Sequence, residues 1–210
     1  MQKYSVFSLI KNAFSNHQNW EVAWKDPTPK SEYDVVIIGG GGHGLATAYY
    51  LAKEHNIRNV AIIEKGWIGG GNVGRNTTII RSNFMYDANA RFNEFGMDLW
   101  RNLSQELNFN VMFSPRGIIN LAHSDAQMNA YARRGNSMRL NGIDAKLLDR
   151  DEVKKLIPMA DFSDEVRFPI FGGLMQPSAG TARHDAVAWG YARQADDMGV
   201  DIIQHCEVTG

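Results

Sequence analysis

Three glycines at a defined spacing carry the clearest chemistry in this sequence. Gly39, Gly41 and Gly44 follow the pattern G-x-G-x-x-G, and Glu64 stands about 20 residues beyond the third glycine. In such a pattern the first glycine permits a tight turn, the second lets the backbone approach a pyrophosphate, and the third allows close helix–strand packing. The spacing therefore predicts a site for the phosphates of a dinucleotide.

Neighbouring residues extend this predicted site. Gly42 and His43 lie in the same loop, where the start of a helix offers backbone N–H groups and positive partial charge to the phosphates. Glu64 can accept hydrogen bonds from the adenosine ribose hydroxyls, and its charge disfavours the 2′-phosphate of NADP. FAD and NAD share the ADP half, so the pattern does not decide between them. The alternative is a glycine-rich turn that binds nothing.

A second glycine-rich stretch, GGGNVGRNTTIIR at residues 69–81, follows the region of Glu64. Its glycines let the backbone pass close to a flat ring, and its polar side chains can bond to polar ring edges. The candidate side chains for these contacts are Asn72, Arg75, Asn76, Thr77, Thr78 and Arg81. This composition favours a redox ring as the ligand. The alternative is an ordinary polar connection.

A third stretch, GTARHDAVAWG at residues 180–190, sets His184 between Arg183 and Asp185. The apolar periodicity that follows predicts that a helix begins at this histidine. Taken by itself, His184 could be a helix-start residue that contacts backbone or solvent. No spacing of histidine, cysteine or carboxylate side chains indicates a metal site.

The elements that must position these residues follow from hydrophobic patterning. Apolar runs at 35–38 and 60–63 are typical of strands buried on both faces, and the stretch 45–54 between them favours a helix. The β-α-β order predicts a parallel sheet. The helix at about 184–198 leads to another strand-like run at 200–206.

The middle of the chain has a different pattern. A long amphipathic helix is predicted over 86–107, and two short strands around a Ser-Pro turn within 110–122. Ser124 can cap a helix that runs toward residue 140, and Asp149 can cap a shorter one before Pro158. The apolar face of the long helix is expected in the core; its residues are Phe92, Phe95, Leu99, Leu103 and Leu107.

Composition narrows the remaining possibilities. The net charge is −1, so no broad attraction to nucleic acid or an anionic membrane is expected. The single cysteine, Cys206, cannot form an internal disulfide, which fits a reducing cytoplasm. No apolar run is long enough to span a membrane. Near the N-terminus, Phe7, Ile10 and Phe14 predict a short amphipathic helix that docks on the body of the protein or on a partner, and residues 25–32 read as a linker.

Together the three motifs resemble the D-amino-acid-oxidase-like flavoprotein superfamily, and within it the beta subunits of heterotetrameric sarcosine oxidases. The resemblance extends from about Trp24 to Gly210. It implies an α/β fold with a Rossmann-like FAD-binding domain and a second, mainly antiparallel-sheet substrate domain. Residues 1–33 would be an extension and linker, and residues 34–210 the N-terminal part of the FAD-dependent oxidoreductase domain. The family chain continues well past residue 210, so we expect a sequence truncated on its C-terminal side.

The resemblance also assigns cofactors. Non-covalent FAD would lie along Gly39–Gly44, Glu64 and the loop Asn72–Ile79, with Val208 as a further contact. FMN would be attached covalently to His184 through the 8α-methyl carbon of the flavin. That attachment needs a neutral imidazole, which a helix N-terminus favours and Asp185 opposes. Arg183 would stabilise negative charge on the reduced flavin.

The implied reaction is the oxidative demethylation of sarcosine to glycine. FAD takes a hydride equivalent from the methyl group, and electrons pass through FMN to oxygen, which yields hydrogen peroxide. Tetrahydrofolate or water takes the one-carbon unit. The implied partners are the alpha, gamma and delta subunits of a cytoplasmic complex. The alternatives are a single-flavin amine oxidase or dehydrogenase acting on dimethylglycine or glycine, an NAD-dependent dehydrogenase, and a truncated interaction subunit without catalysis.

Overall fold

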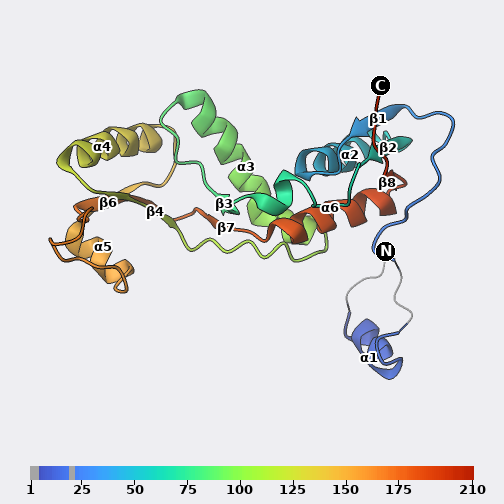
Figure 1. The fold of residues 1–210 in the computed structure, drawn as a ribbon, viewed down its shortest axis with the longest axis horizontal. Helices are drawn as coiled ribbons and strands as arrows, with labels where there is room; N and C mark the ends of the chain where they lie inside the picture. The colour runs from blue at the N-terminus through green and yellow to red at the C-terminus, as the bar shows by residue number, and fades with distance from the viewer. Residues whose placement is uncertain (1–4, 19–21) are drawn as a thin grey trace. The chain divides into compact units, whose positions relative to one another are not determined.

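The computed structural model describes residues 5–18 and 22–210, which belong to two compact units (Figure 1). The first unit comprises the chain up to Thr78 together with Leu103–Met112 and Arg183–Gly210. The second unit comprises Ile79–Asn102 and Phe113–Ala182. Each unit is formed by segments that are distant in sequence, so neither is a continuous piece of the chain.

The first unit is built on a parallel sheet with strand order β1-β2-β8. β1 (Val35–Ile38) leads into helix α2 (Gly42–His55) and then into β2 (Val60–Ile63), and α6 (His184–Asp197) leads into β8 (Asp201–Ile203). The predicted β-α-β unit and its parallel sheet are confirmed. α2 begins earlier than its expected start at residue 45, because the loop glycines themselves form its first turn.

Helices α2 and α6 of the first unit pack against each other and against the sheet. The rings of Tyr49 on α2 and Tyr191 on α6 meet edge to face, with their centroids 5.5 Å apart. Burial of apolar surface between the helices and the sheet is the main stabilising contribution here. The core residues of this layer are Leu45, Ala48, Val60, Ile62, Ala188, Ala192 and Ile202.

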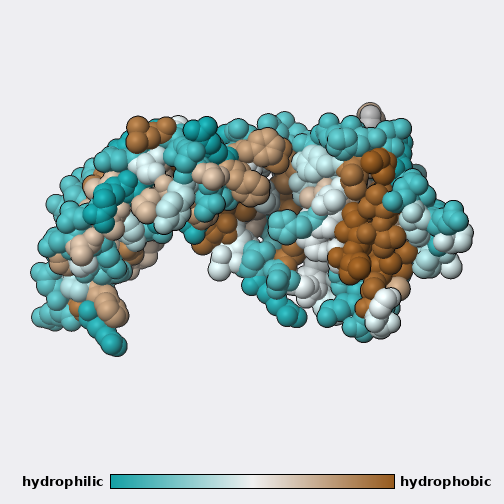
Figure 2. All heavy atoms as spheres, turned by 90° about the horizontal axis from the view of Figure 1, so that it is seen from above, coloured by the Kyte–Doolittle hydropathy of each residue, from teal (hydrophilic) through white to brown (hydrophobic). Residues whose placement is uncertain are grey.

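Strand β1 corrects one expectation. The run 35–38 was predicted to be buried on both faces, but Val36 is 51% exposed and Ile38 is 71% exposed. β1 is one of the two edge strands of the described sheet, and within the described residues the face that bears these two side chains stays open. Figure 2 shows hydrophobic residues gathered on the surface of the first unit, in the region where Figure 1 labels β1 and β2. The apolar run predicted the strand correctly, but it carried no information on what covers each face.

The second unit is built on antiparallel pairs. A three-stranded sheet has the order β4-β6-β5, and a two-stranded ribbon pairs β3 with β7. The predicted second, antiparallel-sheet region is therefore observed. The strands are β3 (Ile79–Ile80), β4 (Ile118–Ala122), β5 (Lys146–Asp149), β6 (Gly172–Gln176) and β7 (Gly180–Thr181).

Helices α4 (Asp125–Leu140) and α5 (Arg150–Leu156) cover this sheet, and both predicted caps are confirmed. The Ser124 side chain accepts a hydrogen bond from the N–H of Gln127. Asp149 and Glu152 form a reciprocal capping box at distances of 2.8 and 2.9 Å. Such caps satisfy N–H groups that the first turn of a helix leaves unpaired.

Helix α3 (Asp87–Glu106) and the segment that follows differ in part from expectation. Leu103 and Leu107 are buried as predicted, but Phe92 is 77% exposed and Phe95 is 65% exposed, so only one end of the apolar face lies in the core. The predicted strand before the Ser-Pro turn does not form. Met112 has a φ of +54°, which is incompatible with an extended strand, and Ser114 makes only an isolated bridge.

Helix α1 (Val6–Phe14) confirms the amphipathic helix expected near the N-terminus. Residues 25–32 form no helix or strand, as expected for a linker, although Lys30 pairs with Asp201 at 2.8 Å. No helix in the described part of the chain has the length and apolar character needed to cross a membrane.

The core of the second unit generates a test of this architecture. Leu174 on β6 is fully buried with Ala90, Met138 and Ile143, whereas its partner across the ladder, Leu147 on β5, is 40% exposed. Leu174→Ala should lower the free energy of unfolding by about 2–5 kcal/mol, and Leu147→Ala by less than about 1 kcal/mol. Urea denaturation of both variants checks this, and equal losses would contradict the assigned core.

Candidate functional site

The turn between β1 and α2 shows the sterics that the glycine spacing predicted. Gly39 has a φ of +105°, a conformation that side-chain-bearing residues rarely adopt, and its N–H donates to the carbonyl of Ile63 at 2.8 Å. A Cβ added at Gly44 would lie 2.1 Å from the carbonyl oxygen of Gly39. The first and third glycines are therefore needed for the fold itself.

The second glycine of the pattern has no such internal role. Gly41 has an extended backbone, and a Cβ added there would meet no atom within 4 Å. Gly41 is also the N-cap of α2, with no side-chain hydrogen bond to the first turn and no acidic residue in that turn. Since the first N–H groups of a helix lack intrahelical partners, this end of α2 is open to an anion.

Glu64, at the carboxyl end of β2, joins the loop by two hydrogen bonds. One carboxylate oxygen accepts the N–H of Gly40 and the other accepts the N–H of Gly66, each at 2.8 Å. A carboxylate has about four acceptor positions, so both oxygens can still accept a hydroxyl hydrogen. The bond to Gly40 was not foreseen from the sequence. It brings the predicted ribose acceptor and the predicted phosphate loop together at one place.

These residues fit the ADP half of a dinucleotide. An uncapped helix end provides donors for phosphate, the open side of Gly41 leaves space for it, and Glu64 provides acceptors for ribose. His43, in the first turn of α2, is exposed. Gly42 lies near the second glycine loop, because a Cβ there would meet Val73 at 3.0 Å.

The second glycine loop contains the short 3-10 helix η1 (Asn72–Arg75), which lies against α6. Asn76 holds the turn that follows: its amide donates to the carbonyl of Val73 and accepts the N–H of Thr78, each at 2.7 Å. Thr78 has a φ of +59°, an outlier for a β-branched residue. Backbone strain of this kind clusters at ligand-binding sites. Asn72, Arg75, Thr77 and Ile79 are exposed.

His184 is the first residue of α6, as its sequence context predicted. Its Nδ1 atom is buried and has no hydrogen-bond partner. Arg183 donates from Nε to both carboxylate oxygens of Asp185, at 2.8 and 3.0 Å. This pairing raises the pKa of Arg183 and lowers that of Asp185. Arg183 and Asp185 therefore bind each other, and the Nδ1 atom of the His184 imidazole is left without a hydrogen bond.

Val208 is the remaining predicted contact. It follows β8 in a segment without helix or strand and is 43% exposed. Within the described residues, no three His, Cys, Asp or Glu side chains are grouped to hold a metal ion.

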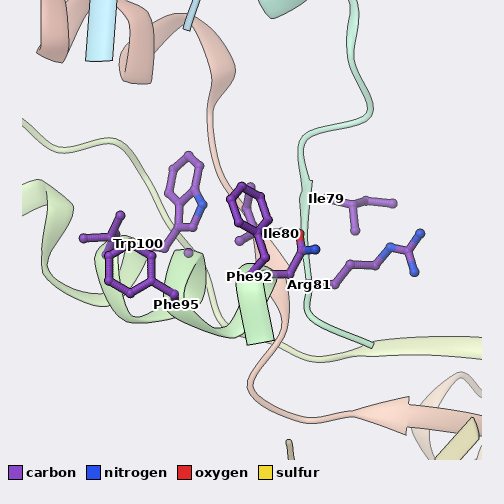
Figure 3. Close-up of a pocket in the computed structure, with 9 residues that line it drawn as sticks. Ile79, Ile80, Arg81, Phe92, Phe95 and Trp100 are labelled. Carbon is purple, nitrogen blue, oxygen red and sulfur yellow. The ribbon is translucent and has the colours of Figure 1, made fainter. Parts of the chain in front are cut away.

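The second unit has a pocket of about 320 Å³ between β3 and α3, which the sequence reading missed. Figure 3 shows the rings of Phe92, Phe95 and Trp100 on the α3 side of the pocket and the Arg81 side chain directed away from them. Arg81 instead binds the amide oxygen of Asn83 and stacks on Phe84. Helical spacing identified Phe92 and Phe95 as part of one face, but it did not include Trp100 and could not show that these residues line a pocket.

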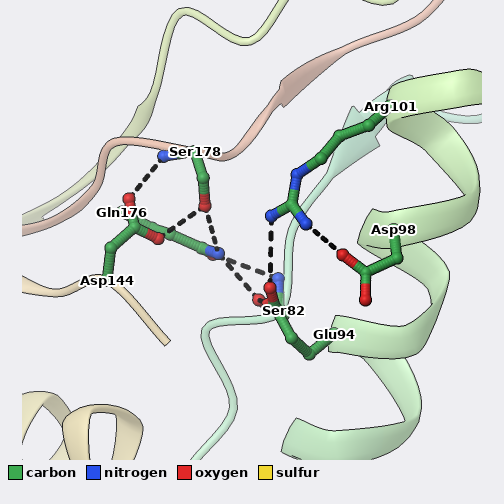
Figure 4. A network of polar contacts seen from close by, with 7 residues as sticks. All are labelled: Ser82, Glu94, Asp98, Arg101, Asp144, Gln176 and Ser178. Carbon is green, nitrogen blue, oxygen red and sulfur yellow. Dashed lines mark hydrogen bonds and ion pairs between the residues drawn. The ribbon is translucent and has the colours of Figure 1, made fainter. Parts of the chain in front are cut away.

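A polar network centred on the buried Gln176 connects the same parts of the second unit (Figure 4). Gln176 on β6 is fully buried; its oxygen accepts the N–H of Ser82 at 3.0 Å and its amide donates to the Ser82 hydroxyl at 2.7 Å. That hydroxyl donates to Glu94 of α3 at 2.5 Å, and Arg101 pairs with Glu94 at 3.2 Å. The network thus ties the end of β3, β6 and α3 together.

Comparison with known proteins decides the family. Residues 34–210 match the family described as FAD dependent oxidoreductase (DAO). The chain belongs to this family. It is 62% identical over 208 residues to a sarcosine oxidase subunit beta of Rhizobium meliloti and 53% identical over 210 residues to one of Rhodobacter capsulatus. These matches cover 99% and 100% of this chain and 50% of each relative, so the chain spans about half their length.

A solved structure, L-proline dehydrogenase from P. horikoshii, has a similar fold. The two share 29% identity with a TM-score of 0.77, over 87% of this chain and 46% of that one. The resemblance inferred from the three sequence motifs is confirmed at the level of the family and of its sarcosine oxidase relatives.

Gly41 has space for a side chain and Gly44 does not, so alanine substitutions at these two positions can test cofactor binding and folding separately. Gly41→Ala should lower the free energy of unfolding of the apoprotein by no more than about 1 kcal/mol, because no atom lies near the new methyl group and only the preference for glycine over alanine at the N-cap is lost. It should weaken FAD binding about tenfold or more, because the methyl group would stand where the backbone approaches the phosphates. Gly44→Ala should destabilise the apoprotein itself. Flavin titration and urea denaturation test both; a Gly41→Ala variant with unchanged FAD affinity would contradict this phosphate site.

The buried network predicts a cost for removing its central amide. Gln176→Leu leaves the N–H and hydroxyl of Ser82 without their partner and should lower the free energy of unfolding by about 1–3 kcal/mol. The matched control is Gln127→Leu, because Gln127 also accepts a backbone N–H but is exposed. That control should cost less than about 0.5 kcal/mol in the same urea experiment. Similar losses in the two variants would show that the buried network is not stabilising.

Proposed function

We propose that this protein is a beta subunit of a heterotetrameric sarcosine oxidase, with residues 34–210 as the N-terminal part of its FAD-dependent oxidoreductase domain. The observation that carries the proposal is the 62% identity, over 208 residues, to a protein of that name. Three features of the structure support the proposal. The start of α2 at Gly41 has no side-chain cap, and Glu64 accepts a hydrogen bond from the same loop. A second unit is built on antiparallel strands.

In this proposal non-covalent FAD lies along the first unit's glycine turn. Backbone N–H groups at the start of α2 bind its phosphates, and Glu64 accepts hydrogen bonds from the ribose. The loop from Asn72 to Ile79 and Val208 contribute further contacts. The strained backbone at Thr78, held by Asn76, supports a role for this loop in binding.

FMN is proposed to be bound covalently to His184. The supporting observation is the buried Nδ1 atom without a hydrogen-bond partner, since native proteins pair most such atoms. The Arg183–Asp185 ion pair keeps both charged neighbours engaged, so neither binds the imidazole in the described structure. Arg183 remains positively charged in this pair and is proposed to favour negative charge on the reduced flavin.

The proposed reaction converts sarcosine to glycine and reduces oxygen to hydrogen peroxide. When bound, the flavins supply the electron acceptor for the N-methyl group and the route to oxygen. Tetrahydrofolate would take the one-carbon unit as 5,10-methylenetetrahydrofolate. The chain's own residues bind and orient the cofactors. The alpha, gamma and delta subunits are the proposed partners.

Covalent attachment at His184 gives the sharpest test. Acid denaturation of the full-length complex, followed by gel separation, should leave flavin fluorescence on the band of this subunit. Mass spectrometry should find the peptide around Arg183–Trp189 heavier by one FMN. In a His184→Gln complex the fluorescent band should disappear, while non-covalent FAD released by acid should stay at the wild-type amount.

Two other results are informative. Free FAD with an unmodified His184 peptide would replace the proposal with a single-flavin amine oxidase or dehydrogenase. An Asp185→Asn complex is the matched control, because it alters the same turn without removing the imidazole. It should keep the fluorescent band if His184 carries the flavin.

A further inference from the structure

Gln204 is the residue directly after β8, and it joins the end of that strand to the loop beyond Glu64. Its side-chain oxygen accepts the N–H of Ile68 at 2.9 Å, across 136 residues of sequence. Ile68 is 4% exposed, and buried backbone N–H groups in native proteins are paired. Neither residue belongs to the glycine motifs or to the proposed cofactor contacts, so those motifs do not account for this bond.

Ile68 packs on the predicted phosphate loop. A Cβ added at Gly40 would lie 2.7 Å from Cδ1 of Ile68 and 3.1 Å from Cβ of Glu64. Gly40 is buried, and its N–H is the one that donates to the Glu64 carboxylate at 2.8 Å. The Gln204 oxygen therefore holds Ile68 against the residue that binds Glu64, so the two loops of the candidate site keep one relative position.

The main chain around Gln204 is fixed on two sides. The N–H of Glu64 donates to the carbonyl of Ile203 at 2.9 Å, and the carbonyl of Glu64 accepts the N–H of Cys206 at 3.0 Å. The N–H of Gln204 itself donates to the carboxylate of Asp26 at 3.1 Å. Because these bonds already hold the backbone of Gln204, its side chain can bind Ile68 at a low ordering cost.

We infer that Gln204 is a positioning residue for FAD: by holding Ile68 against Gly40, it keeps the Glu64 carboxylate where the adenosine ribose binds. This inference rests on the proposed function, which puts the ribose at Glu64. Without the Gln204 oxygen the buried N–H of Ile68 has no acceptor, so the loop moves away from Gly40 to reach water. The bond between Gly40 and Glu64 is then weakened, and the ribose acceptor is no longer fixed before FAD arrives.

The experiment uses the full-length complex with all subunits co-expressed. The variant is Gln204→Met, which keeps the length of the side chain but has only a weakly accepting sulfur. Fluorescence of the FAD released on dilution of the complex gives its dissociation constant. One lost hydrogen bond corresponds to about three- to tenfold weaker FAD binding. The covalent flavin band assigned to His184 should stay at the wild-type amount, because that residue takes no part in the bond.

Two controls separate positioning from general stability. Gln194→Met removes a glutamine of the same unit whose amide donates to the carbonyl of Leu107 at 2.7 Å, outside the two loops. It should lower the melting temperature but leave FAD affinity within about twofold of wild type. The second control is a double-mutant cycle with Glu64→Gln, since residues that act through one another are not additive. In the Glu64→Gln background, Gln204→Met should weaken FAD binding by less than about twofold.

The possible outcomes distinguish the inference from the proposed function. Equal FAD affinity of the Gln204→Met complex and wild type would overturn the inference, and so would single effects that multiply in the double variant. A Gln204→Met complex that loses FAD only together with its fold, seen as a melting temperature far below that of Gln194→Met, would assign the residue a structural role and overturn it as well. A wild-type complex without FAD would instead contradict the proposed function.

Discussion

The close approach of α2 to the end of β1 is the constraint on which the proposed nucleotide site depends. The carbonyl of Gly39 lies where a side chain at position 44 would stand, so the helix can sit this near the strand only without a Cβ there. That contact directs the start of α2, and thus its unpaired N–H groups, toward the open side of Gly41. It also leaves the N–H of Gly40 within 2.8 Å of Glu64. If α2 moved outward, the donors for phosphate and the acceptor for ribose would no longer share one loop.

Two side chains that the sequence predicted as ligand contacts also form hydrogen bonds that stabilise the loops of the candidate site. Glu64 binds two backbone N–H groups, and Asn76 forms the turn that keeps Thr78 in its strained conformation. In the second unit, Gln176 does the same for the chain that leaves β3. These bonds are internal, so the loops are positioned before any ligand arrives. Preorganisation of this kind reduces the ordering cost of binding.

Local sequence features predicted local structure well, because their physical cause is local. Ser124 and Asp149 cap the helices they precede, and His184 begins the helix that follows it. The failures concern burial. The apolar run that contains Val36 correctly predicted a strand, and the apolar periodicity that includes Phe92 correctly predicted a helix. Both side chains are nevertheless exposed. Periodicity shows which residues share a face, whereas burial depends on what is packed against that face. The Gln176 network likewise depends on contacts between residues that are distant in sequence.

The start of α6 shows how neighbouring charges can leave one group available for chemistry. Arg183 and Asp185 satisfy each other at 2.8 Å, and the Ala186 N–H also donates to Asp185. The pair carries no net charge, so its field at the proposed flavin is weaker than that of a lone arginine. Within the same turn, the buried Nδ1 of His184 gains no bond. Leaving a buried polar atom without a hydrogen bond lowers the free energy of unfolding by about 1–3 kcal/mol. The Asp185 carboxylate lies in the same turn, yet it does not bond to this atom. This arrangement supports the proposal that the imidazole binds a ligand, because a histidine with a purely structural role would be expected to use the carboxylate beside it.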